Sequence, residues 1–267
     1  MSNLYFECGN GISGDMSVGA LLDLGASRDK LDTALKSMGL DEEFTYKISE
    51  VKVNSIKATD FDVIINQPLT PNPSPSRGEG NQAHHRYHHE HDSHYHHHHH
   101  RNLSDVISII DKAETTENAK NLAKKIFTIV AEAESKVHGL PLDEVHFHEV
   151  GAIDSIADIV SFAVLFDDLG VNKVYFKSLT EGTGTVECQH GIMNVPVPAV
   201  CEIASKYKLP LKITDNEGEM ITPTGAAIAA ALYTGEKLPE TLTIEKVGNG
   251  AGKRPYKNPV LRVIQFN

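Results

Sequence analysis

The residues with the clearest potential for metal chemistry are histidines concentrated in one internal segment. Residues 84–100 read HHRYHHEHDSHYHHHHH and hold eleven of the fifteen histidines of the 267-residue chain. Neutral imidazole is a borderline donor that suits Ni, Cu, Zn and Co. An expression tag or a solvated linker is the alternative, but a tag is terminal and uninterrupted. The segment therefore predicts transition-metal binding, and its predicted ligands include His96, His97, His98, His99 and His100.

A more selective metal site is predicted by the motif VHFHEVGAIDSIADIV at residues 145–160. On a strand, His146 and His148 point to the same face, and Asp154 and Asp158 would lie one turn apart on the following helix. Asp154 could instead cap that helix. Asp158 has apolar neighbours and needs a cation or hydrogen-bond donors. We expect these four side chains to bind a metal ion.

Cys188 and His190 form a second pair, in the sequence EGTGTVECQHGIM. A thiolate with an imidazole favours Ni, Zn or Cu over Mg. A buried cysteine is more often a small apolar residue than a ligand, so this pair alone is weak evidence. It gains weight because His146, His148 and His190 are three of the four histidines outside residues 84–100.

A glycine-rich loop, CGNGISGD at residues 8–15, lies between a predicted strand and a predicted helix. Its glycines match G-x-G-x-x-G, but a second helix is predicted where a dinucleotide-binding fold needs a strand. We expect Gly11, Ser13 and Gly14 to approach a single phosphate at the helix N-terminus, although Asp15 would repel it unless a cation intervenes. The alternative is a tight turn that lets the helix pack on its strand.

The turn Thr222-Pro223-Thr224-Gly225 opens another predicted helix. Thr222 is the expected N-cap. The hydroxyls of Thr222 and Thr224 could also face a ligand.

These residues must be positioned by strands and helices, and the order of the expected elements predicts the fold class. It is a mixed α/β fold, with mixed sheet layers, flanking helices and a disordered His-rich insertion. Residues 1–66 form an N-terminal lobe, residues 67–101 the Pro/Ser/His-rich insertion, and residues 102–267 the main metal-handling lobe. The expected strands are 3–7, 44–53, 57–65, 145–148, 173–179, 211–214, 242–247 and 260–266. The expected helices are 15–24, 27–38, one capped by Ser104, 116–137, 154–169, and two opened by Pro196 or Pro198 and by Pro223.

The composition of the sequence argues against two classes of binding partner, nucleic acids and membranes. The net charge of −11 argues against nucleic acid as a partner and suits cations. No apolar run approaches the roughly 20 residues that cross a bilayer, so we expect no membrane association. Three cysteines without a CxxC motif agree with a reducing compartment, and we expect a cytoplasmic protein.

Five motifs together resemble the nickel-insertion protein (LarC) family of nickel-pincer cofactor biosynthesis. They are LYFECGNGISGDMSVGALLDLGA, HFHEVGAIDSIADIV, GTGTVECQHGIMNVPVPA, EMITPTGAAI, and GNGAG with PVLRV. The resemblance implies a nickel cyclometallase, a lyase of the metal-chelatase type, which places Ni(II) into pyridinium-3,5-bisthiocarboxylic acid mononucleotide. It also implies CTP and a divalent cation as helpers, and lactate racemase and related apoenzymes as users of the product.

Members of that family usually continue past PVLRV into a CTP-binding C-terminal domain, whereas this sequence stops at Asn267. We therefore expect such a domain to act in trans, and we expect a homo-oligomer. In the leading hypothesis, Asp15 accepts the ring proton that is lost when carbon binds nickel. The alternatives are a nickel storage or delivery protein without catalysis, and a metal-dependent hydrolase.

Overall fold

A six-stranded mixed sheet forms the framework of the protein. The computed structural model describes residues 2–66, 101–145, 153–188, 191–254 and 259–267. Strand β1 is parallel to β4 and antiparallel to β10, which confirms the predicted mixed α/β class. In spatial order the strands are β2 (Phe44–Val53), β3 (Ile56–Ile65), β9 (Ile244–Ala251), β10 (Val260–Phe266), β1 (Asn3–Glu7) and β4 (Lys173–Phe176).

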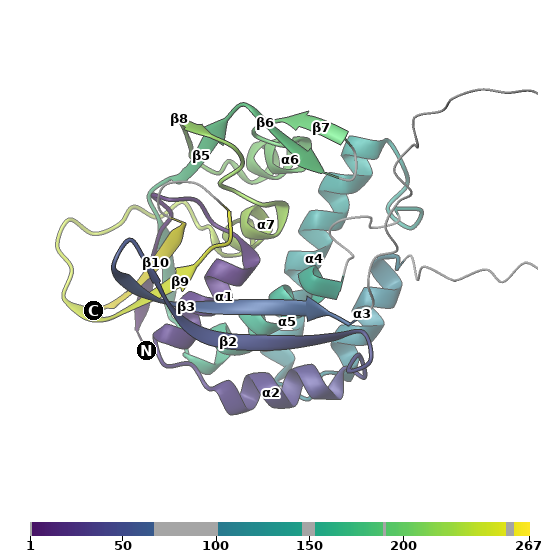
Figure 1. Ribbon diagram of the computed structural model, residues 1–267, viewed down its shortest axis with the longest axis horizontal. Helices are drawn as coiled ribbons and strands as arrows, with labels where there is room; N and C mark the ends of the chain where they lie inside the picture. The colour runs from purple at the N-terminus through teal and green to yellow at the C-terminus, as the bar shows by residue number, and fades with distance from the viewer. Residues whose placement is uncertain (1, 67–100, 146–152, 189–190, 255–258) are drawn as a thin grey trace, which may run out of the picture.

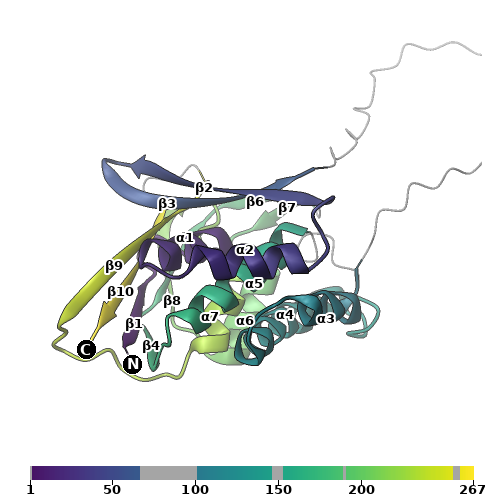
Figure 2. The same cartoon turned by 90° about the horizontal axis from the view of Figure 1, so that it is seen from below.

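Seven helices lie in the described part of the chain, and Figure 2 shows them on the inner side of the curved sheet. They are α1 (Gly14–Asp23), α2 (Arg28–Ser37), α3 (Leu103–Lys112), α4 (Glu117–His138), α5 (Ile153–Asp168), α6 (Pro198–Tyr207) and α7 (Pro223–Leu232). Two small sheets lie at the end of the molecule opposite α2 (Figure 1). One pairs β5 (Leu179–Thr183) with β8 (Leu211–Glu217), and the other pairs β6 (Thr185–Cys188) with β7 (Gly191–Asn194).

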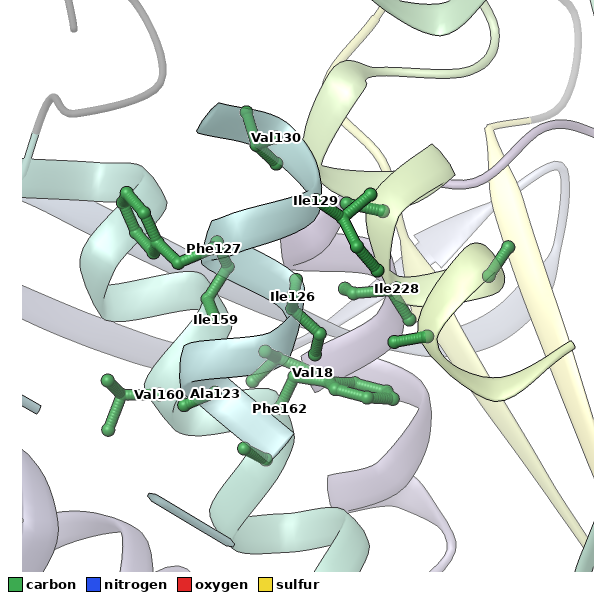
Figure 3. Close-up of a cluster of buried hydrophobic side chains, with 14 of the residues drawn as sticks. Val18, Ala123, Ile126, Phe127, Ile129, Val130, Ile159, Val160, Phe162 and Ile228 are labelled. Atoms are coloured by element: carbon green, nitrogen blue, oxygen red, sulfur yellow. The ribbon is translucent and has the colours of Figure 1, made fainter. Parts of the chain in front are cut away.

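Helix α5 is central to the fold because it is apolar almost all round. Helices of that kind are stable only when other elements cover them. Figure 3 shows side chains of α5 packed against α4, α1 and α7, with Phe162, Ile126, Val18 and Ile228 among them. A carboxylate on so buried a helix, such as Asp158, is therefore held firmly in place.

The sequence predicts the cap of α3 wrongly. Asn102, not Ser104, is the N-cap, and its side chain accepts a 3.0 Å hydrogen bond from the N–H of Asp105. The Asp105 carboxylate accepts in return from the N–H of Asn102, at 3.0 Å. This reciprocal capping box satisfies two N–H groups, which a cap at Ser104 would not do.

The predicted strand 173–179 is two strands. Its first part, β4, pairs with β1 in the main sheet, whereas β5 begins at Leu179 and pairs with β8. The predicted strand 145–148 lies outside the described residues except for Val145, which is buried and belongs to no strand. Residues 67–100 of the predicted insertion also lie outside them. The division into lobes stays a prediction, although the main sheet takes strands from both sides of that segment.

Candidate functional site

A cavity of about 650 Å³ lies where α1 and α7 begin and α4 ends. The N-terminal turns of α1, α5, α6 and α7 reach it, together with β6 and the residues that follow β9. It is large enough for a small-molecule ligand. Its polar lining residues are Ser13, Asp15, Glu134, His138, Asp154, Ser155, Asp158, Glu187, Cys188, Glu219, Thr222, Thr224, Lys253 and Arg254.

The glycine loop places Asp15 beside Asp158. A Cβ atom at Gly14 would collide with the Asp158 carboxylate, so only glycine allows α1 and α5 to approach this closely here. The backbone N–H of Asp15 donates to that carboxylate, and the N–H of Met16 donates to Asp15 Oδ1 at 2.9 Å. The Ser13 hydroxyl also donates to Asp15 Oδ1. Carboxylates therefore already accept from the N–H groups of Asp15 and Met16, two of the donors at the start of α1 that a phosphate would use.

Asp154 and Asp158 have raised pKa values. Although part of Asp158 is accessible from the cavity, desolvation raises its pKa well above the ordinary value, and the charges of Asp15 and Asp154 add to this effect. Asp154 is exposed towards the cavity, yet desolvation by the surrounding walls raises its pKa as well. Crowded carboxylates favour a bound cation, because a cation relieves both desolvation and repulsion.

Lys253 is the positively charged residue that acts electrostatically on both Asp154 and Asp158. Desolvation lowers its pKa, but the hydrogen bond to Asp62 and the charges of Asp15, Asp62 and Asp60 outweigh that and raise it. The charge of the same ammonium group opposes the rise in the pKa values of Asp154 and Asp158 but does not cancel it. Lys253 is thus a counter-charge with which a metal ion bound in this cavity would compete.

A second basic residue, Arg254, follows on the same wall. Its guanidinium forms an ion pair with Glu219, whose side chain is only 5% exposed. Lys253 and Arg254 are the Lys and Arg residues among the described residues that line the cavity. Both remain about half exposed, so a ligand in the cavity can reach them.

Cys188 and His138 supply softer donors. The Cys188 thiol lines the cavity and donates to the carbonyl of Gly191 at 3.4 Å. His138 is the last residue of α4, and its Nε2 lies 3.3 Å from Glu134 Oε2. The sequence did not indicate that this histidine and its partner would line the same cavity as Asp15.

The threonines of the TPTG turn also reach the cavity. Thr222 is the N-cap of α7, as predicted, and its hydroxyl accepts from the N–H of Gly225 at 3.1 Å. Thr224 is buried and lines the cavity too. Gly11 instead packs against the carbonyl of Met220, which a Cβ atom would meet, while Ser13 and Gly14 line the cavity.

The predicted ligand set is only partly described. His146, His148, His190 and His96–His100 lie outside the described residues. Among the residues that the structure describes, no group of three or more His, Cys, Asp or Glu side chains is placed to hold a metal ion. Asp15, Asp154, Asp158 and Cys188 do meet in one cavity. Lys253, Arg254 and Glu219 were missed, although Lys253 and Arg254 directly follow the GNGAG motif.

The fold and the cavity define an α/β protein with an acidic pocket suited to cations. A family model described as "Nickel insertion protein" matches residues 4–266. This chain belongs to the nickel insertion protein family, as the sequence resemblance implied. No solved structure matches it. None of the helices described here has the length and apolar character needed to span a membrane.

Several relatives are named "Pyridinium-3,5-bisthiocarboxylic acid mononucleotide nickel insertion protein". The one from Alkaliphilus metalliredigens is 49% identical, over 100% of this chain and 62% of its own length. The relative from Acetivibrio thermocellus is 43% identical, over 95% of this chain and 57% of its own length. The one from Geobacillus kaustophilus is 39% identical, over 99% and 59% respectively. This chain therefore spans about three fifths of the length of these relatives.

Proposed function

We propose that this chain binds Ni(II) in the acidic cavity and inserts it into pyridinium-3,5-bisthiocarboxylic acid mononucleotide. The observation that carries the proposal is the meeting of Asp15, Asp154 and Asp158 around one cavity with Cys188 on its wall. The names of the relatives supply the substrate. The reaction class is that of a nickel cyclometallase, a lyase of the metal-chelatase type.

Nickel in this proposal is the cargo, so its ligands must exchange readily. Carboxylate and imidazole groups are harder donors than sulfur. The soft thiocarboxylate sulfurs of the substrate can therefore displace them from Ni(II). Asp154, Asp158 and Cys188 are the described donors, and His146, His148 and His190 stay predicted ones. Residues His96–His100 would gather nickel from solution.

The carbon–nickel bond requires a base. When nickel bonds to the pyridinium carbon, the C–H bond breaks and its proton must leave. Asp15 is half-buried at the start of α1 and faces the cavity, and its carboxylate would accept that proton. The two sulfur–nickel bonds form without a further proton transfer from carbon.

The substrate is anionic, so the acidic cavity must also supply positive charge. Lys253 and Arg254 would bind its phosphate, because carboxylates already accept from the N–H groups of Asp15 and Met16 at the start of α1. The expected approach of Gly11, Ser13 and Gly14 to the phosphate stays a prediction, with Ser13 and Gly14 forming the cavity wall. Thr222 and Thr224 remain candidates for contacts with the rest of the ligand.

The wider setting follows from the family resemblance. CTP with a divalent cation would assist the reaction, bound by a C-terminal domain of the kind that the resemblance implies. A lactate racemase-type apoenzyme would take the product, and the chain would work as a homo-oligomer in the cytoplasm. No step above depends on these partners.

The test is formation of the cofactor by purified components. The chain is mixed with Ni(II), the mononucleotide, CTP, Mg²⁺ and the C-terminal region of a relative, and the nickel-containing product is detected by mass spectrometry. We expect product with the natural chain and none with Asp15→Ala. Asp41→Ala is the control, because Asp41 is exposed and does not line the cavity.

Two outcomes would contradict the proposal. Nickel binding without any product would favour a storage or delivery protein. Normal turnover by Asp15→Ala would remove Asp15 from the proton transfer.

A further inference from the structure

Glu181 on β5 is a charged side chain with no exposed surface. Its Oε1 atom accepts three backbone hydrogen bonds, from Gly182 at 2.8 Å, Met220 at 2.6 Å and Ile221 at 3.2 Å. Its Oε2 atom has no hydrogen-bond partner among the described residues. Burying a carboxylate is costly, so its place in the fold calls for a specific role.

The N–H groups of Met220 and Ile221, which donate to Glu181, belong to a segment of the cavity wall. Glu219, Met220 and Thr222 line the cavity, between the end of β8 and the start of α7. A connecting segment usually moves more than the elements that it connects. Here its middle is tied to a buried side chain on β5 instead.

The same segment holds the glycine loop. The N–H of Ile12 donates to the Met220 carbonyl at 3.0 Å, and the N–H of Thr222 donates to the Ile12 carbonyl at 3.2 Å. Ile12 and Ile221 form an isolated parallel bridge. The close packing of Gly11 on Met220 leaves no space for a side chain between the two segments.

A continuous chain of contacts therefore runs from Glu181 to the carboxylates of the cavity. Glu181 fixes Met220 and Ile221, these fix Ile12, and the loop after Ile12 leads directly to Gly14 and Asp15. The links are hydrogen bonds from backbone N–H groups to the Glu181 carboxylate, backbone hydrogen bonds at Ile12 and a contact without free space at Gly11, so a shift at one end is passed to the other.

We propose that Glu181 is a positioning residue that sets the distance between Asp15 and Asp158 by holding the 219–222 segment against the glycine loop. It does so as a hydrogen-bond acceptor for Met220 and Ile221 and does not touch nickel or substrate. The proposal deepens the proposed function, because it names a residue on which the nickel-binding geometry depends.

Hydrogen exchange of the full chain tests this positioning role without requiring nickel insertion. The informative amides are Ile12 and Thr222, whose hydrogen bonds do not involve Glu181. We expect Glu181→Ala to raise their exchange rates about tenfold or more, the equivalent of one buried N–H left without an acceptor. Glu181→Gln keeps an acceptor at Oε1, and its exchange at these amides should stay within about twofold of the natural chain.

A matched control separates positioning from general loss of stability. Leu35→Ala opens the core on α2, at the other end of the molecule (Figure 1). We expect it to raise exchange broadly, with no preference for Ile12 and Thr222. If Glu181→Ala is not folded, Glu181→Asp, which is one methylene shorter, provides the same comparison.

Nickel titration gives the second readout. We expect Glu181→Ala to weaken nickel binding about tenfold and Glu181→Gln to restore it, as the loss and return of one buried acceptor would do. Two results would overturn the positioning role. One is exchange in Glu181→Ala that shows no preference for Ile12 and Thr222. The other is a Glu181→Gln variant that loses as much nickel affinity as Glu181→Ala. Failure of the natural chain to form product would overturn the proposed function. The hydrogen-exchange result would still test the positioning role of Glu181.

Discussion

The carboxylate of Asp158 lies against Gly14, in the space that a side chain at position 14 would occupy. The N–H of the next residue, Asp15, donates to the same carboxylate. Two acidic residues that are 143 positions apart in the sequence are therefore brought together by the absence of one methyl group.

The first prediction concerns that contact. Gly14→Ala should push Asp158 away from the start of α1, lower the free energy of unfolding by about 1–3 kcal/mol and weaken nickel binding about tenfold. Thermal unfolding and calorimetric titration with Ni(II) measure these two effects.

Gly9→Ala is the matched control, since a Cβ atom there meets nothing within 4 Å. It lies in the same loop and should leave both stability and nickel affinity close to those of the natural chain. Equal effects of the two substitutions would show that Gly14 has no special relation to Asp158.

The second prediction concerns pH and Asp158. Its pKa in the folded protein lies well above the ordinary value of 3.8, so the folded state holds the proton more tightly than the unfolded state. The free energy of unfolding of the metal-free protein should therefore fall as pH rises from 3.8 through the raised pKa.

Asp158→Asn removes this penalty. At neutral pH the metal-free variant should be more stable than the natural chain by at least about 1 kcal/mol, and the difference should shrink as pH falls towards the ordinary pKa. It should also lose nickel affinity. Chemical denaturation at several pH values is the measurement, with Asp41→Asn as an exposed control. A variant that is less stable than the natural chain at every pH would contradict the prediction.

The third prediction separates metal from substrate at Lys253. Lys253→Met removes a positive charge that would compete with nickel in the proposed site, so nickel affinity should rise about 3- to 10-fold. The same change removes a proposed partner of the substrate phosphate, so the KM for the mononucleotide should rise. Lys237→Met, an exposed residue away from the cavity, should change neither. A fall in nickel affinity together with a rise in the KM, or a rise in nickel affinity together with a fall in the KM, would argue against the assigned role of Lys253.

Much of the fold could be predicted from local patterns. The strand Asn3–Glu7, the hairpin of β2 and β3, and the proline-opened helices α6 and α7 follow from alternation, turns and Pro at the first helical turn. The break between β4 and β5 could not, because it depends on which sheet accepts each half. Asn102 was missed as a cap because its partner is Asp105 rather than the usual Glu or Gln.

The candidate site was predicted only where its residues form short motifs. Asp15, Asp154 and Asp158 stand in motifs with chemical meaning, and all three line the cavity. Lys253, Arg254 and Glu219 belong there through tertiary packing, which leaves no periodic signal in the sequence. Glu181 lies in a short strand and gave no sign that it would bind the backbone of Met220 and Ile221.

The most direct measurement is nickel binding by a chain whose eleven histidines at residues 84–100 are replaced by asparagine. Calorimetry should show about one tightly bound Ni(II) per chain, lost when Asp154→Asn and Asp158→Asn are added, because the proposed function assigns the ion to the cavity rather than to the histidine segment. No tight binding in the asparagine-replaced chain, or binding that the two added substitutions do not change, would contradict a nickel site in the cavity.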